Sequence, residues 1–356
     1  MAAEKKPANK WFKQLTESYE DAVDYSYDSF APENAIYTPS PYFNWIFANK
    51  ANGVPRNASI LFYSEPKAGK SLSIYSIILE MQKRDPEGIA IYFNTEMRGA
   101  LQHGVFDALD RQRMVIYDTN QAADIFDRIE GDIKAMVQDG MPLRIIAIDS
   151  LNGIMGTKRG NADSVDNHLV GDQALTLKNG LSKLIPFCKA NKIMLIGTAQ
   201  MAANMDAGPY GPKEKMNASW YTRHAFEYYI SLKKAGAAED KKDIEGKTFE
   251  DEDVKDARGN KLMNAHKVFV KMEQSSIGQA GRAGVFTLSY QDGIINQNEE
   301  IFWLAKNLDI ITTKNNRTYE YKGLSFNGKG QTAEALKDPA LAAQVLAEII
   351  AKDANR

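Results

Sequence analysis

Apolar runs and amphipathic stretches alternate between residues 58 and 200, and this alternation restricts the chain to few folds. The apolar runs lie at 58–64, 88–94, 114–118, 143–150 and 192–200. Patterns typical of helices separate them, at 70–84, 121–138 and 168–190. Continuous apolar strands that alternate with helices indicate a parallel sheet that is covered on both faces. We therefore predict an α/β fold with a mainly parallel, doubly wound sheet.

The pattern changes after residue 200. Apolar runs with tighter turns follow, and they read HAFEYYISLKK, HKVFVKMEQ and GVFTLSYQDGII. These runs predict antiparallel strands added to one edge of the sheet. The charged run 237–256 predicts a solvated hairpin or loop rather than a functional site.

The two ends of the chain differ from this core. Residues 8–23 place Trp11, Phe12, Leu15, Tyr19 and Val23 on one face of a short helix. A segment rich in turn-forming residues follows and predicts an extended linker. We expect three parts, which are an N-terminal helix and linker at 1–35, an α/β core at 36–297 and a small C-terminal α/β module at 298–356.

Composition excludes several classes of protein. The chain has 356 residues, which allow a sizeable core, and its net charge of -2 excludes a uniformly basic nucleic-acid-binding surface. It begins with no apolar signal segment and has no apolar run long enough to span a membrane. Cys188 is the only cysteine, so it has no partner for an internal disulfide, and we expect it to pack as a small apolar side chain. We expect no membrane partner and a cytoplasmic location.

Residues 64–71 read Ser-Glu-Pro-Lys-Ala-Gly-Lys-Ser, between a predicted strand and a predicted helix. A P-loop has glycine where Ser64 stands, followed by the same Gly-Lys-Ser ending. In such a loop, backbone N–H groups face phosphates, Lys70 neutralises them and the Ser71 hydroxyl binds Mg²⁺. The alternative is a Gly-Lys-Ser sequence that opens an unrelated helix. The predicted nucleotide-binding residues of this segment are Ser64, Glu65, Pro66, Lys67, Ala68, Gly69, Lys70, Ser71 and Leu72.

Three further polar residues follow predicted strands. Asp149 ends the strand RIIAID and suits a carboxylate that holds Mg²⁺, although a helix N-cap is the alternative. Glu96 follows the run 88–94 and is placed to polarise a water molecule, and Gln200 closes the run 192–200. Because carboxyl ends of parallel strands share one edge of a sheet, we expect these residues near the 64–71 loop.

The order of these motifs resembles the ATPase core of RecA-family DNA recombinases. The glutamate after the second strand, the run Ile-Ile-Ala-Ile-Asp-Ser and the strand that ends in glutamine all match that order. The stretch 39–64 and the irregular P-loop look most like bacteriophage UvsX recombinases, and the similarity covers about residues 36–350. The resemblance implies that residues 1–35 are a polymerisation arm and that 36–297 are an ATPase core, in the cytoplasm of a bacterial host if the chain is phage-encoded.

The resemblance implies ATP and Mg²⁺ as ligands and a role for each matched residue. Lys70 and Ser71 would bind phosphate and Mg²⁺, Asp149 would hold the metal, Glu96 would be the catalytic carboxylate and Gln200 the nucleotide sensor. His103 falls where the family often stacks an aromatic ring on adenine, and its alternative is a surface helix residue. The family also supplies two lysines across a subunit interface. Lys271 matches one of them, but Glu273 occupies the other position, so Arg282 is the alternative cation; both cations also suit an ordinary surface.

The resemblance further implies two DNA-binding loops, at about 155–167 and 201–218. Both are rich in Gly and Asn and carry cations, as contacts with a single-stranded backbone require. Their alternative is a plain surface loop. The predicted DNA-binding residues are Lys158, Arg159, Met201, Tyr210, Lys213 and Lys215.

The function that we expect is an ATP-dependent recombinase that forms helical filaments on single-stranded DNA and exchanges strands with double-stranded DNA. A recombination mediator protein is a possible further partner. The alternatives are a hexameric RecA-fold helicase, or a RecA-fold scaffold or signalling ATPase that binds protein. A short N-terminal arm and a small C-terminal module favour the recombinase, because such helicases usually carry a sizeable domain before the core.

Overall fold

The computed structural model describes residues 14, 31–48, 52–97, 104–157, 171–204, 208, 214–236, 241–276, 278–315 and 317–354. Gln14 is helical, and the rest of the predicted 8–23 helix lies outside the described residues. The described part of the predicted linker forms a 3₁₀ turn η1 (Pro32–Asn34) and strand β1 (Ala35–Ile36), which pairs with β2 (Val54–Pro55). The short helix α2 (Pro41–Trp45) lies between these two strands in the chain.

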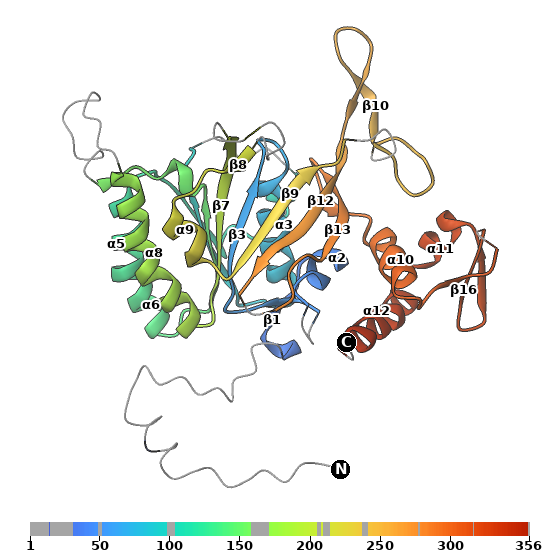
Figure 1. The fold of residues 1–356 in the computed structure, drawn as a ribbon, viewed down its shortest axis with the longest axis horizontal. Helices are drawn as coiled ribbons and strands as arrows, with labels where there is room; N and C mark the ends of the chain where they lie inside the picture. The colour runs from blue at the N-terminus through green and yellow to red at the C-terminus, as the bar shows by residue number, and fades with distance from the viewer. Residues whose placement is uncertain are drawn as a thin grey trace.

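A ten-stranded mixed sheet forms the centre of the described chain (Figure 1). Its main path runs in the order β14-β13-β12-β9-β3-β7-β6-β4-β5, and β8 (Glu214–Met216) pairs with β7 beside that path. Along this path, the strands from β9 to β5 are all parallel to one another. These parallel strands are β9 (Tyr228–Lys234), β3 (Ser59–Ser64), β7 (Met194–Ala203), β6 (Leu143–Asp149), β4 (Ile89–Asn94) and β5 (Met114–Asp118). The mixed α/β architecture agrees with the predicted α/β fold.

The antiparallel part of the sheet lies beyond β9. Strand β12 (Ala265–Ser275) pairs with β9 and with β13 (Ala283–Ser289), and β13 pairs with β14 (Gly293–Ile295), all antiparallel. The prediction was wrong for HAFEYYISLKK, because its first residues end helix α9 (Trp220–Ala225) and its strand, β9, runs parallel to β3. The apolar pattern of a run does not reveal the direction of its strand. Here the chain returns through α9 to the edge of the sheet where β3 begins, so β9 runs parallel to β3.

Helices cover both faces of the sheet. Helix α3 (Lys70–Arg84) packs on one face, in a core with α2 and with α4 (Gly104–Asp107). Helices α5 (Ala122–Arg128) and α8 (Asp172–Ala190) pack on the other face, where α5 continues through a π-helical turn (Ile129–Ile133) into α6 (Lys134–Gln138). Cys188 is buried in this second core, as predicted.

The last part of the chain forms a smaller cluster beside the sheet (Figure 1). It contains α10 (Gln297–Asn307), α11 (Lys329–Ala335) and α12 (Pro339–Ala354) around their own apolar core. It also contains a three-stranded sheet of β15 (Thr312–Thr313), β16 (Thr318–Tyr321) and β17 (Leu324–Asn327). Arg282 ties this cluster to the large sheet, since its guanidinium pairs with Asp353 of α12 at 2.6 Å.

Two further observations bear on the sequence predictions. Strands β10 (Glu250–Lys255) and β11 (Lys261–Met263) form an antiparallel hairpin with an exposed turn, which agrees with the predicted hairpin, although Phe249 of the acidic run is buried. Among the described residues, no helix combines the length and the apolar character that crossing a bilayer requires.

Candidate nucleotide site

The 64–71 loop joins the end of β3 to the start of α3. Lys67 and Gly69 both have positive φ, at 64° and 97°, which turns the chain sharply before the helix begins at Lys70. A Cβ atom at Gly69 would lie 2.2 Å from Leu288 Cδ2, so a larger residue there would also force Leu288 of β13 to move. The first N–H groups of a helix lack intrahelical partners, and with the helix dipole they attract anions. The loop therefore has the backbone form of a phosphate site.

Lys70 folds back over this loop. Its Nζ donates to Ser64 Oγ at 2.8 Å and to the Ser64 and Glu65 carbonyl oxygens at 3.4 Å. The Ser64 hydroxyl in turn donates to the Glu65 carbonyl at 2.7 Å. The serine that replaces the first glycine of a P-loop thus gives the lysine an additional acceptor.

Asp149 lies at the carboxyl end of β6 and is only 7% exposed. Its Oδ2 accepts hydrogen bonds from the Ser71 hydroxyl at 2.5 Å and from the Tyr92 hydroxyl at 2.6 Å, and its Oδ1 accepts one from Thr198 at 2.5 Å. The 3₁₀ turn that follows β6 has Ser150 as N-cap, so Asp149 is not that cap. The alternative interpretation of this aspartate is therefore wrong for the turn that follows it.

Tyr92 is a donor that sequence reasoning missed. Burial and the neighbouring Asp149 carboxylate raise the pKa of Tyr92 well above its usual value, so its hydroxyl keeps its proton. The parallel register places Asn94 opposite Asp149, which brings the strand with Tyr92 beside β6.

Glu96 and Gln200 meet at the same edge of the sheet. Glu96 Oε1 accepts from Gln200 Nε2 at 2.5 Å and from Ser150 Oγ at 3.0 Å. Two donors on one oxygen fix the orientation of the carboxylate. The sequence prediction that strand-end residues gather here is confirmed for Glu96, Asp149 and Gln200.

These side chains border one cavity of about 650 Å³. The cavity lining includes Lys70, Ser71, Glu96, Asp149 and Gln200. On the opposite side, the lining includes residues from the antiparallel part of the sheet. Its complete lining is Pro66, Lys67, Gly69, Lys70, Ser71, Leu72, Tyr75, Glu96, Asp149, Gln200, Lys234, His266, Leu288 and Tyr290. Among the other predicted loop residues, Glu65 is exposed, whereas Ser64 and Ala68 are buried.

The far wall of the cavity was not predicted. Lys234 ends β9, His266 lies on β12, and Tyr290 follows β13 with its ring 5.3 Å from the ring of His266. Burial and the nearby Lys234 ammonium lower the pKa of His266 to about 4, so the imidazole is neutral at about pH 7. The strand pattern was visible in the sequence, but the order of strands that brings this wall to the loop was not.

Lys271 and Arg282 do not line the cavity. Lys271 pairs with Glu273 at 2.6 Å on β12. Arg282 stacks on the Trp45 ring at 4.6 Å in addition to its ion pair with Asp353, and its side chain is 13% exposed. A role across a subunit interface stays a prediction for both, and for Arg282 it requires that the ion pair open.

The predicted DNA-binding residues lie mostly outside the described residues. These are Lys158, Arg159, Tyr210 and Lys213, and the adenine-stacking candidate His103 also lies outside. Met201 and Lys215 are described, on the β7–β8 hairpin where Met201 is opposite Met216 and Ala202 is opposite Lys215. This hairpin continues directly from Gln200 at the cavity.

The site offers few protein ligands for a metal ion. Within the described ranges, no group of three or more His, Cys, Asp or Glu side chains is arranged to hold a metal. Ser71 and Asp149 together offer a hydroxyl and a carboxylate oxygen. Mg²⁺ is commonly bound by one or two protein oxygens together with substrate phosphates and water, so this pair fits that ion.

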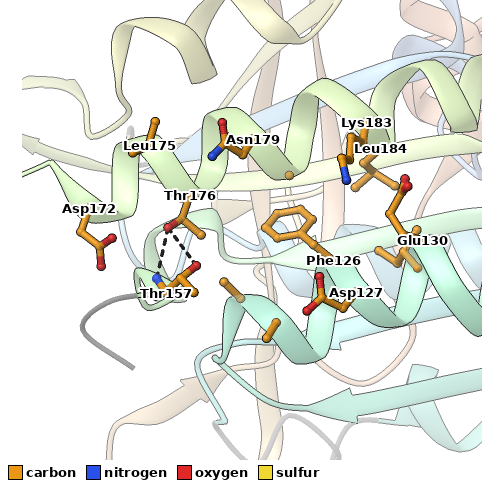
Figure 2. A pocket seen from close by; sticks show the side chains of 14 residues that line it. Phe126, Asp127, Glu130, Thr157, Asp172, Leu175, Thr176, Asn179, Lys183 and Leu184 are labelled. Atoms are coloured by element: carbon orange, nitrogen blue, oxygen red, sulfur yellow. Dashed lines mark hydrogen bonds between the residues drawn. The ribbon is translucent and has the colours of Figure 1, made fainter. Parts of the chain in front are cut away.

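A second cavity, of about 400 Å³, lies between α5 and α8 on the other face of the sheet (Figure 2). Phe126 reaches from α5 to α8, where a Cβ at Gly180 would come within 2.4 Å of its ring. Thr157 and Thr176 are hydrogen-bonded at its edge, at 3.1 Å from backbone nitrogen to hydroxyl. The charged groups around it are separated along two helices and do not converge on one point, unlike those at the 64–71 loop.

Comparison with known proteins adds no assignment. No protein family matches the chain, and no curated protein is similar to it.

Proposed function

We propose that the cavity at the 64–71 loop binds Mg-ATP and hydrolyses it. The observation that carries this proposal is the hydrogen bond between Ser71 and Asp149 beside Lys70, at the start of α3. A hydroxyl, a carboxylate and an ammonium that converge on a helix N-terminus fit a triphosphate with its metal ion better than an uncharged ligand.

The residues of the proposed site would have different roles in phosphate binding, metal binding and hydrolysis. Lys70 and the first N–H groups of α3 would bind phosphate oxygens, for which Lys70 must leave Ser64. Bound Mg²⁺, held by Ser71 and Asp149, would neutralise charge on the phosphates. Glu96 would orient and deprotonate the attacking water, and Gln200 of β7 holds its carboxylate in place.

The wider proposal is a DNA recombinase of the RecA type, with single-stranded and double-stranded DNA as partners and a helical filament as the active assembly. The resemblance of the motifs supports it, as does the path of the chain from Gln200 into the β7–β8 hairpin that carries Lys215. ATP would favour one arrangement of this hairpin, and hydrolysis would release it.

Turnover of ATP by Lys70→Ala tests the nucleotide site. Because Lys70 supplies the cation that meets the phosphates, we expect loss on the order of 100-fold or more. Lys83→Ala, on an exposed turn of the same helix, is the matched control and should keep wild-type turnover. Wild-type turnover in Lys70→Ala would refute the proposed site.

Negative-stain electron microscopy tests the recombinase proposal separately. The full chain is mixed with single-stranded DNA and a non-hydrolysable ATP analogue. Helical filaments support a recombinase, hexameric rings would favour the helicase, and ATP hydrolysis without DNA binding would favour a protein-binding ATPase.

A further inference from the structure

The side chain of Asn152 lies between two segments that leave the cavity. Its Oδ1 accepts from the Gln200 backbone N–H at 2.9 Å, and its Nδ2 donates to the Asn217 carbonyl at 2.6 Å. Asn217 follows β8 (Glu214–Met216), the antiparallel partner of β7. The amide of Asn152 therefore bridges Gln200 within β7 and the residue that follows β8.

This bridge extends the ladder between β7 and β8. The pairing includes Met201 opposite Met216, and the Asn217 backbone N–H donates to the Gln200 carbonyl at 2.8 Å. The next connection passes through the Asn152 side chain, which acts like an inserted peptide group. A side-chain amide supplies the required acceptor and donor on two separate atoms, whereas a carboxylate lacks the donor and an aliphatic side chain lacks both.

The backbone around Asn152 also holds the start of α8. Gln173 Nε2 donates to the Asn152 carbonyl at 3.0 Å and to the Ile154 carbonyl at 2.7 Å. Gln200 therefore joins two networks: its side chain holds Glu96 in the cavity, and its backbone is held by Asn152. A displacement of Gln200 consequently changes hydrogen bonds that reach Asn217 and α8.

We infer that Asn152 is a positioning residue that couples occupancy of the nucleotide cavity to the backbone of residues 214–217. Asn152 lies outside the cavity lining, so it acts through Gln200 and not on the nucleotide. The inference rests on the proposed nucleotide function and specifies how that site is connected to the hairpin. When a ligand moves the Gln200 amide away from Glu96, the Asn152 bridge transmits the new backbone position to Asn217.

Hydrogen exchange at residues 214–217, with and without a fluorescent non-hydrolysable ATP analogue, tests this coupling. We expect the analogue to change exchange there in the wild-type protein, and Asn152→Leu to reduce the change about tenfold, because two hydrogen bonds are lost. Asn152→Asp keeps the acceptor but loses the donor, so it should also reduce the change in exchange. This variant replaces Asn152→Leu in the test if the leucine variant folds poorly. The dissociation constant of the analogue should stay within about twofold of wild type, because a purely structural defect would weaken binding as well.

Asn191→Leu is the matched control. Its amide also donates to a backbone carbonyl, that of Phe187 at 2.9 Å, but at the far end of α8. It should leave the exchange response intact. Tight binding with an unchanged response in both Asn152 variants would overturn the inference alone, whereas absence of binding by the wild-type protein would overturn the proposed function and the inference with it.

Discussion

Two carboxylates in this protein are shielded from water by different neighbours. Asp149 borders the cavity at the 64–71 loop and accepts from three side-chain hydroxyls. Glu300 lies between α10 and the start of α2, where its Oε2 accepts from the Ser40 hydroxyl at 2.5 Å and from the Tyr42 backbone N–H at 3.0 Å. Their exposed fractions are similar, at 7% and 3%.

The difference lies in how freely the donors can move. A hydroxyl can rotate and release a carboxylate when a cation or a phosphate enters, whereas a backbone N–H at a helix terminus is fixed by the helix. The hydroxyl donors around Asp149 can therefore turn toward other partners. The backbone donor to Glu300 cannot, so this contact holds α10 against the start of α2. Burial of a charged group does not by itself identify a functional site, and the mobility of its partners separates the two cases.

The largest expected effect is on catalysis. Asp149→Asn keeps the shape of the side chain but removes the charge that would hold Mg²⁺, so ATP turnover should fall on the order of 100-fold. The melting temperature should change little, since hydroxyl donors can reorient toward an amide. Asp118→Asn, at the end of β5 along the same sheet edge but outside the cavity lining, is the control. Equal loss of turnover in both variants would contradict the assignment of Asp149.

The next effect is on stability. Glu300→Ala leaves a small void and removes the acceptor of Ser40 and Tyr42, which should lower the free energy of unfolding by about 3 kcal/mol. Urea denaturation measures this, with the exposed Glu334→Ala as control, where the expected loss is below about 1 kcal/mol. ATP turnover per folded molecule should remain that of the wild type. A loss of ATP turnover per folded molecule in Glu300→Ala would contradict the distinction between the two carboxylates.

The pH dependence of stability gives a third test. Burial, with a smaller effect of Glu299, raises the pKa of Glu300 well above its usual value, so the folded protein binds this proton more tightly than the unfolded chain. Between the usual pKa of a glutamate and the raised pKa of Glu300, the free energy of unfolding should therefore decrease as pH rises. Glu300→Gln should remove the part of this decrease that comes from Glu300. Urea midpoints between about pH 5 and pH 8 measure the difference. Parallel curves for the two proteins would show that Glu300 does not contribute.

The smallest effects come from matched deletions of one hydroxyl at each carboxylate. Ser40 also caps α2, since its Oγ accepts from the Phe43 N–H at 3.0 Å, so Ser40→Ala should cost about 2 kcal/mol of stability. Tyr92→Phe leaves Asp149 with Ser71 and Thr198 as donors and should cost about 1 kcal/mol or less. Only the second variant should alter the Mg²⁺ concentration that half-saturates turnover. The reverse order of stability losses would mean that donor mobility does not distinguish the sites.

Much of the fold was predictable because its strands are short apolar runs between helical patterns. Helix α3 has the predicted bounds, and β3, β4, β5 and β6 lie within the predicted apolar runs. Periodicity carries no information on strand direction, so β9 was predicted with the wrong direction relative to β3. The π-helical turn inside the 121–138 helix likewise left no mark in the apolar pattern.

The candidate site was predictable where it follows from strand ends and not where it follows from strand order. Glu96, Asp149 and Gln200 end or follow parallel strands, so one sheet edge collects them. His266 and Tyr290 reach the cavity only because β12 and β13 extend the sheet beyond β9. The partners of Arg282 were equally hidden, since Asp353 and Trp45 are distant in the sequence.

The contact between Gly69 and Leu288 limits how this protein can change by mutation. A side chain at Gly69 would force the end of Leu288 to move, and a smaller residue at 288 would relieve that contact. That change removes the steric obstacle but leaves the φ of 97° at position 69, which only glycine adopts readily. The two positions are therefore epistatic in one direction: position 288 can vary while glycine stays at 69, but a replacement of Gly69 carries a backbone penalty in every background. Saturation libraries at both positions should recover many residues at 288 and almost only glycine at 69.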